Sequence, residues 1–300
     1  MRRSLTGRRS KMNSKEWPLL VFSLSMQLSA GIILIYDLFL LSPLYRNRVE
    51  IPARFQWILL IALGAAILGI CLSLLHLGNP LHAARSVANI GTSWLSREIL
   101  SVLIYTGLLV VVTYLHFRYP SAGRSLKWLV DVTAVTGLIL IFIMSRIYMI
   151  PARPAWNTLF TPVGFYLAAL IMGSALLLIF QINTGSWASQ KALAILTLTV
   201  AIIQLILVPA YMTWLGEIAS TSGYGLGNLL GDHLVAFYIR IVLYILAIGF
   251  GIWALLSIRS DTLQNRYLFL PAFLTLCSVL AAQIVDRYLF YSQNISADGF

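Results

Sequence analysis

Charged residues are scarce in this chain. Of its 300 residues only 10% are charged and 59% are hydrophobic, and the mean hydropathy is +0.86. A soluble domain of this size carries about 25% charged residues. The scarcity excludes a soluble globular protein and predicts a polytopic helical membrane protein, since a spanning helix needs about 20 mostly apolar residues. The alternating pattern of a membrane β-barrel is also absent.

Cysteine and histidine are rare too, with two cysteines and four histidines. Cys71 and Cys277 fall in apolar runs, and two cysteines are too few for an iron–sulfur cluster, which normally takes four. A membrane haem usually needs histidines that face one another across a bundle. His76 and His116 are expected at opposite membrane faces, and no motif supports a pairing of His76 with His233. We therefore expect neither a haem nor an iron–sulfur cluster in this chain.

The apolar residues are grouped in long runs that predict eight membrane-spanning helices. The runs cover residues 18–41, 55–77, 98–117, 128–149, 162–182, 192–215, 234–256 and 267–290. The predicted fold class is therefore all-α, a polytopic bundle with a basic tail over 1–17, a membrane domain over 18–291 and a C-terminal tail over 292–300. The first run is too long for a cleavable signal peptide, and Met12 is an alternative start to Met1. Every loop is too short for a soluble domain.

The net charge of +11 does not indicate nucleic-acid binding, because the basic residues are spread over loops and the N-terminal tail. Lys and Arg accumulate in the cytoplasmic loops of membrane proteins. With the first eleven residues set aside, the loops after the first, third, fifth and seventh runs hold most of them. An even number of spans puts both termini on one side, and these loop charges favour termini outside.

The stretch from His76 to Glu98 is the first candidate for chemistry. It reads HLGNPLHAARSVANIGTSWLSRE and joins the second and third runs. A short connection makes the two helices antiparallel neighbours, so both ionisable groups lie at one membrane face. Each fits a helix end, where the dipole favours a cation at the C-terminus and an acid at the N-terminus. Together they favour function, because an acid and an imidazole could exchange protons with a small redox molecule in the membrane.

A second candidate is SRIYMIPARPAWNT at 145–158, which ends the fourth run at the same face as His76. Arg146 lies within the run, so it either meets a partner acid or ligand oxygen or snorkels to the interface. Tyr148 either orients a ligand or belongs to the aromatic belt at the membrane surface. For Trp156 the aromatic belt is the favoured interpretation.

Arg240 lies inside the seventh run and needs a partner. The candidate partners are Glu217, Asp232 and Glu98. A structural ion pair is the favoured interpretation, although a secondary transporter or exporter would also use an intramembrane arginine and acid. No clear internal repeat supports a transporter. The pair Asp286 and Arg287, followed by Tyr288, Phe290 and Tyr291, is typical of an anchor at the membrane interface.

Several segments carry a family pattern. They are Glu16-Trp17-Pro18-Leu19 at the first run, HLGNP at 76–80 with Glu98 opening the third run, SRIYMIPARPAWNT at 145–158, and Arg287-Tyr288-Leu289-Phe290-Tyr291 near the C-terminus. Together they resemble the membrane-anchor subunit of bacterial dimethyl sulfoxide reductase, within the wider superfamily of polysulfide-reductase-type anchors. The resemblance extends over essentially the whole chain.

The resemblance implies an integral subunit of a three-part complex for anaerobic respiration in a bacterial inner membrane. A molybdopterin subunit reduces the terminal acceptor, and an iron–sulfur subunit with four cubane clusters carries electrons to it. The anchor oxidises menaquinol, and family anchors carry no haem. The terminal acceptor binds another subunit, so this sequence does not name it. A passive anchor without a quinone site is an alternative, as is the transporter.

The family's quinol site includes the histidine of HLGNP and the following glutamate, which correspond to His76 and Glu98. We expect His76 to hydrogen-bond a quinol oxygen and Glu98 to accept a proton. The residues expected around the quinol are His76, Gly78, Asn79, His82, Arg85, Glu98, Arg146 and Tyr148. The family tends to have arginine where this chain has His82, so either His82 or Arg85, one helical turn on, completes the rim.

Overall fold

The computed structural model describes residues 17–41, 54–76, 89–119, 126–182, 186–221, 233–258 and 267–292, and in these ranges it holds helices and no strand. The long helices are α1 (Trp17–Leu41), α3 (Arg54–His76), α5 (Trp94–Arg118), α6 (Lys127–Tyr148), α7 (Phe160–Gln181), α8 (Trp187–Thr221), α10 (Leu234–Ser257) and α11 (Phe269–Ser292). Each of these eight helices is long and apolar enough to cross a membrane. The predicted all-α, polytopic fold class is confirmed for the described part of the chain.

Two helices extend beyond the apolar runs that predict them. α5 begins at Trp94 rather than at residue 98, because the side chain of Ser93 accepts a hydrogen bond from the backbone N–H of Ser96 and caps the helix. Glu98 therefore lies one turn inside α5 and not in its first turn. α8 likewise begins at Trp187 and ends at Thr221, well outside the predicted 192–215. Polar residues extend both helices, and a hydropathy pattern does not detect them.

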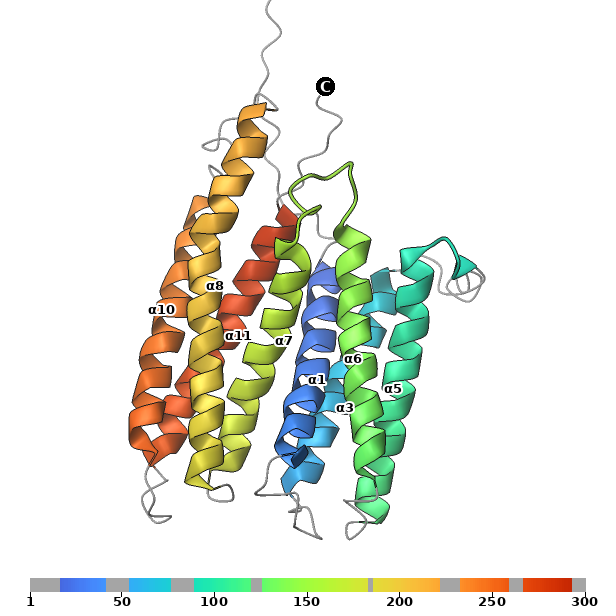
Figure 1. Ribbon diagram of the computed structural model, residues 1–300, viewed down its shortest axis with the longest axis vertical. Helices are drawn as coiled ribbons and strands as arrows, with labels where there is room; N and C mark the ends of the chain where they lie inside the picture. The colour runs from blue at the N-terminus through green and yellow to red at the C-terminus, as the bar shows by residue number, and fades with distance from the viewer. Residues whose placement is uncertain are drawn as a thin grey trace, which may run out of the picture.

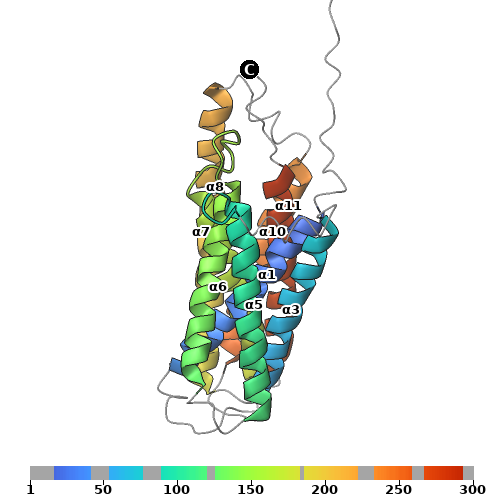
Figure 2. The same cartoon turned by 90° about the vertical axis from the view of Figure 1, so that its right-hand side faces the viewer.

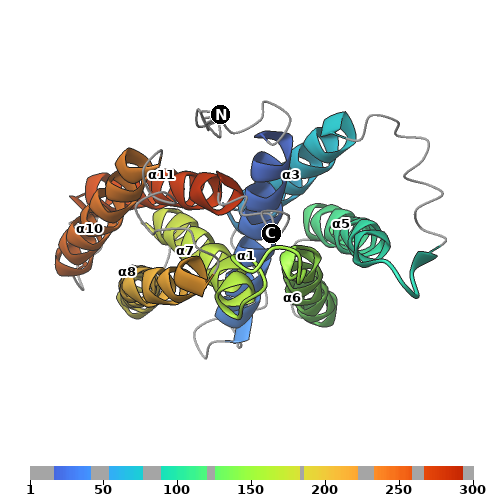
Figure 3. The same ribbon diagram turned by 90° about the horizontal axis from the view of Figure 1, so that it is seen from above.

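The helices run antiparallel in chain order and form two groups of four. α1, α3, α5 and α6 make the first group, and α7, α8, α10 and α11 make the second (Figure 1). Seen along the helix axes, the two groups lie side by side and meet where α1 packs against α7 (Figure 3). In the first group, α5 lies between α3 and α6 on the outer face (Figure 2).

One end of the bundle gathers the start of α1 and the end of α11 (Figure 1). We call it the N/C end. Because neighbouring helices alternate in direction, α3 and α6 also end there, and α5, α7 and α10 begin there. The predicted placement of the first and last spans at one side is therefore seen in the described helices.

Glycine allows the close packing of α1 against α7. A Cβ added at Gly31 would overlap the carbonyl oxygen of Ala169, and one added at Gly173 would lie 2.5 Å from the backbone of Gly31. Small residues at such positions let membrane helices approach closely, and dispersion contacts then hold them together. α1 also packs against α3, α6 and α11, so it is the central helix of the bundle.

Replacement of Gly31 by alanine should separate α1 from α7. The Gly31→Ala variant is expected to be destabilised by about 1–3 kcal/mol, the usual cost of overpacking, and the loss is measured as a lower midpoint of thermal unfolding in detergent. Gly107→Ala on α5 is the matched control, because a Cβ there meets nothing within 4 Å. Equal midpoints for the two variants would show that the α1–α7 contact is not tight.

Candidate functional site

The structure describes only some of the residues that the sequence predicts around a quinol. Glu98, Arg146 and Tyr148 have described side chains, and His76 is described only as the last residue of α3. The described part of the chain leaves out Gly78, Asn79, His82 and Arg85. Because α3 ends and α5 begins at the N/C end, His76 and Glu98 belong to helix segments at the same end of the bundle (Figure 1).

Glu98 is a buried carboxyl without a protein partner in the described residues. It is 8% exposed, and among those residues its side chain makes no hydrogen bond and no ion pair. Its carboxyl is close enough to the hydroxyl groups of Tyr148 and Tyr291 to interact with them electrostatically. An ionisable group left unpaired at this depth is costly, so Glu98 is suited to meet a ligand or to take up a proton.

Tyr148 connects the two groups of helices at the N/C end. Its hydroxyl forms a hydrogen bond of 2.7 Å with the hydroxyl of Tyr291, which lies 3.5 Å from Oγ of Ser23. Its ring meets the rings of Trp156 and Phe290 edge-on, with centroids 5.7 and 5.4 Å away. Tyr148 is nevertheless only partly buried. It therefore begins a hydrogen-bonded network that runs from α6 through α11 to α1.

Trp156 is not part of an aromatic belt. It is 7% exposed, its Nε1 donates a hydrogen bond of 2.8 Å to the carbonyl oxygen of Phe290, and the two rings stack. It also packs with Ala155 and Leu215 in a small apolar cluster. The favoured interpretation of Trp156 is therefore wrong, because the segment between α6 and α7 folds back over the end of the bundle.

Arg146 meets no acid among the described residues. Its guanidinium lies over the ring of Trp94, 5.3 Å from the centroid, and its Nη1 is 3.6 Å from the sulfur of Met149. Trp94 and Glu98 are four residues apart in α5, so they share one face of that helix. Arg146 thus brings a cation from α6 to the face of α5 that carries Glu98.

Arg240 and Arg287 have partners that the sequence does not predict. Nη1 of Arg240 donates to Oδ1 of Asp286 at 2.8 Å, so neither Glu217 nor Glu98 is its ion-pair partner. The third expected acid, Asp232, lies outside the described residues. Arg287 is 6% exposed, donates to Oε1 of Gln27 at 2.8 Å and lies 3.9 Å above the ring of Phe165. The interpretation of Asp286 and Arg287 as an interface anchor is wrong, because Arg287 points into the bundle.

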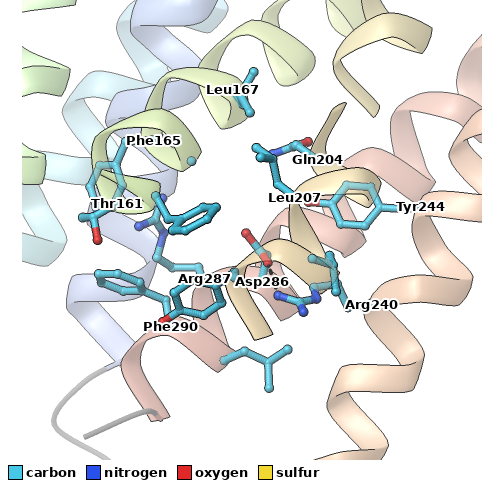
Figure 4. Close-up of a pocket in the computed structure, with 15 residues that line it drawn as sticks. Thr161, Phe165, Leu167, Gln204, Leu207, Arg240, Tyr244, Asp286, Arg287 and Phe290 are labelled. Carbon is cyan, nitrogen blue, oxygen red and sulfur yellow. Dashed lines mark hydrogen bonds and ion pairs between the residues drawn. The ribbon is translucent and has the colours of Figure 1, made fainter. Parts of the chain in front are cut away.

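A cavity of about 110 Å³ lies in the second group, between α7, α8, α10 and α11. Figure 4 shows Asp286 between Arg287 and Arg240 on its polar side. Phe165 and Phe290 line the cavity and also pack against Tyr148, so they separate it from the first group. Sequence reasoning misses this cavity because its lining comes from four helices, and because it assigns Arg240 to an ion pair and Asp286 with Arg287 to an interface anchor.

Groups suited to a metal ion are not found in the described residues: no three side chains of His, Cys, Asp or Glu come together there. His116 lies near the end of α5, away from the N/C end, and its Nδ1 is 2.8 Å from the carbonyl oxygen of Val112. His233 precedes α10 and lies 3.4 Å from the hydroxyl of Tyr288. The chemistry that the described residues offer at this end of the bundle is therefore that of a carboxyl, tyrosine hydroxyls, guanidinium groups and the imidazole of His233.

Comparisons with known proteins show what this sequence is similar to. It is 28% identical to the C subunit of anaerobic dimethyl sulfoxide reductase from Escherichia coli strain K12 over 292 residues, which are 94% of this protein and 96% of that subunit. It is also 28% identical to the YnfH subunit of anaerobic dimethyl sulfoxide reductase from the same organism, over 94% of this protein and 95% of that subunit. The C subunit from Haemophilus influenzae is 29% identical over 54% of this protein and 57% of its own length.

The match to a family model covers nearly the whole chain. The sequence profile of the DMSO reductase anchor subunit (DmsC) matches residues 12–293. That range includes all eight described helices. The chain is therefore a multi-pass membrane protein that belongs to the family of dimethyl sulfoxide reductase anchor subunits.

Proposed function

We propose that this protein is the menaquinol-oxidising membrane anchor of a molybdopterin oxidoreductase in a bacterial inner membrane. An anchor subunit of this family works with catalytic and electron-transfer subunits. In our proposal, menaquinol binds at the N/C end between α3, α5 and α6. Its electrons pass to a partner subunit with four iron–sulfur clusters, and a molybdopterin subunit uses them to reduce the terminal acceptor in anaerobic respiration.

The burial of Glu98 is the observation that carries the proposal. Oxidation of a quinol releases both hydroxyl protons together with the electrons, so the site needs a group that accepts a proton. Glu98 is buried and makes no hydrogen bond or ion pair with another described residue, and it lies at the helix start that follows the loop from His76. A carboxylate there would take the proton from one quinol hydroxyl and release it to water at the bundle end.

Arg146 and His76 complete the proposed chemistry. As a quinol hydroxyl loses its proton, negative charge develops on its oxygen, and a fixed cation stabilises that charge. Arg146 is held by the ring of Trp94 on the face of α5 that carries Glu98, and no described carboxylate neutralises it. His76, at the end of α3, would hydrogen-bond the other end of the quinol head group. Gly78, Asn79, and His82 or Arg85, in the loop that follows α3, would form the rim.

The position of Arg240 favours this proposal over a transporter. Secondary transporters bind their substrates and ions near the bilayer midplane, where helices are interrupted. Arg240 lies in the second turn of α10, and Asp286, with which it pairs, lies within two turns of the end of α11. An ion pair near the helix ends is suited to hold the two helices together and not to carry an ion across.

Replacement of Glu98 by glutamine should stop quinol-driven reduction. Loss of a general base typically costs about 10²–10⁴-fold in rate, and Glu98→Gln removes the proton acceptor while keeping the side-chain shape. The measurement is dimethyl sulfoxide reduction by membranes supplied with a menaquinol analogue. The amount of membrane-bound complex is followed through reduction driven by a dye that bypasses the anchor.

Asp131→Asn is the matched control for this variant. Asp131 lies at the opposite end of the bundle, where it pairs with Lys127, so quinol-driven activity should stay at the level of the unmodified protein. If Glu98→Gln lost dye-driven and quinol-driven activity in equal measure, the glutamate would be needed for assembly and not for catalysis.

Replacement of Tyr148 by phenylalanine tests the hydrogen-bonded network beside the site. Tyr148→Phe keeps the ring packing and removes the hydroxyl that bonds Tyr291. In our proposal the Tyr148 hydroxyl also contacts the quinol, and the loss of one such hydrogen bond, worth about 1 kcal/mol, predicts a roughly fivefold rise in the KM for the menaquinol analogue. Tyr166→Phe, which loses a hydrogen bond of 2.9 Å to the carbonyl oxygen of Leu138, is the control and should leave the KM unchanged. An unchanged KM in both variants would remove Tyr148 from the site.

A further inference from the structure

We infer that the cavity between α7, α8, α10 and α11 binds the phosphate group of an anionic phospholipid. The cavity lies in the second group of helices, whereas the proposed quinol site lies in the first. The aromatic rings of Phe165 and Phe290 stand between the two places. The proposal of a lipid site therefore does not depend on whether the protein oxidises menaquinol.

The charges around the cavity favour an anion. Its lining includes the guanidinium groups of Arg240 and Arg287 and the carboxylate of Asp286, which leaves one net positive charge (Figure 4). Tyr244 lines it as well, and its hydroxyl accepts a hydrogen bond from Nε2 of Gln283, which leaves its O–H to donate. The hydroxyl of Tyr211, also in the lining, donates to the carbonyl oxygen of Ala155. Arginine binds phosphate strongly, because its planar fork donates several hydrogen bonds to the anionic oxygens.

Arg240 has hydrogen-bond donors that the described residues leave unused. It is 5% exposed, and its Nη1 is bonded to Asp286. Its Nε and Nη2 are buried and have no hydrogen-bond partner among the described residues, and the same holds for Nε of Arg287. A buried donor without an acceptor costs about 1–3 kcal/mol. Each of these atoms has less than 1 Å² of accessible surface, so the oxygens of a phosphate group in the cavity would supply the missing acceptors once the two guanidinium groups turn toward it.

The size of the cavity suits a phosphate group. Its volume is about 110 Å³. An engineered apolar cavity of about 150 Å³ is the size that takes up a single benzene ring. A phosphate group is smaller than a benzene ring and fits the cavity. The acyl chains of the lipid would remain outside the cavity.

The surroundings of the cavity suit those acyl chains. On α8 and α10, which border the cavity, apolar side chains such as Ile206, Ile239 and Val242 are about half exposed on the outer surface of the bundle. Arg240 and Arg287 lie within two turns of the helix ends, near the depth where lipid head groups meet hydrocarbon. Basic pockets between membrane helices bind anionic lipid head groups.

Gly164 offers a way to fill the cavity without changing a charge. It lines the cavity, and an added Cβ there meets nothing within 4 Å. Gly164→Leu should therefore fill part of the cavity, with its Cβ in open space. Gly107→Leu on α5 is the matched control, because Gly107 also has open space around its Cβ and lies outside the cavity lining.

The first measurement is the phospholipid that stays with the purified complex after detergent washing, counted by mass spectrometry. Gly164→Leu is expected to retain about one anionic phospholipid fewer per complex than the unmodified protein, as a single basic pocket predicts. Gly107→Leu should match the unmodified protein. Equal retention in all three would overturn the proposal. Quinol-driven activity, measured on the same samples, reports separately on the quinol site.

The second measurement identifies the ligand. Phosphatidylglycerol, phosphatidylcholine or inorganic phosphate is added to delipidated complex, and thermal unfolding is followed. Phosphatidylglycerol should raise the midpoint for the unmodified protein and for Gly107→Leu but not for Gly164→Leu. An equal rise with phosphatidylcholine would rule out selectivity for anionic lipid. The same rise with inorganic phosphate would assign the site to the free ion. If Gly164→Leu lost binding of a hydroxyquinoline inhibitor but retained the lipid, the site would be assigned to quinol.

Discussion

The close contact between α1 and α7 is the constraint on which the N/C end of the bundle depends. Ser23, Gln27 and Gly31 are spaced four residues apart in α1, so they lie on one face of that helix. Gly31 sets this face against α7, because no larger residue fits there. The same face then places Gln27 beside Arg287 and Ser23 beside Tyr291 of α11. One backbone contact therefore positions the polar residues near the proposed quinol site.

The side chains where the two groups of helices meet at the N/C end border two different proposed sites. On one side, Tyr148 is bonded to Tyr291 and lies near the carboxyl of Glu98, which no other described residue pairs. On the other side, Arg287 and Phe290 line the cavity that carries net positive charge. The proposed proton acceptor and the proposed anion site thus lie at the same end of the bundle, separated by a few rings. A lipid phosphate bound in the cavity would hold Arg287 and Phe290 in place on the side away from the quinol.

The sequence predicts the helices well because each long apolar run is a local property. A run of about 20 apolar residues must satisfy its backbone groups internally in lipid, so it becomes a helix wherever it lies in the chain. The loop between residues 76 and 98 is short, and this alone places His76 and Glu98 at one end of the bundle. The helix ends are less well predicted, since Ser93 extends α5 through a cap that hydropathy does not register.

The sequence by itself therefore determined the class, the span order and the residues that cannot face lipid without a reason, among them Glu98 and Arg146. Only the tertiary structure decided which polar groups meet: Arg240 with Asp286, Arg287 with Gln27 and Tyr148 with Tyr291. The residues of the last two pairs are 260 and 143 positions apart. The physical reason is that lipid tails are as apolar as leucine, so hydrophobicity does not distinguish the face of a membrane helix that packs against protein from the face that meets lipid. Small residues such as Gly31 and specific hydrogen bonds choose the neighbours, and their effect appears only when the helices are assembled.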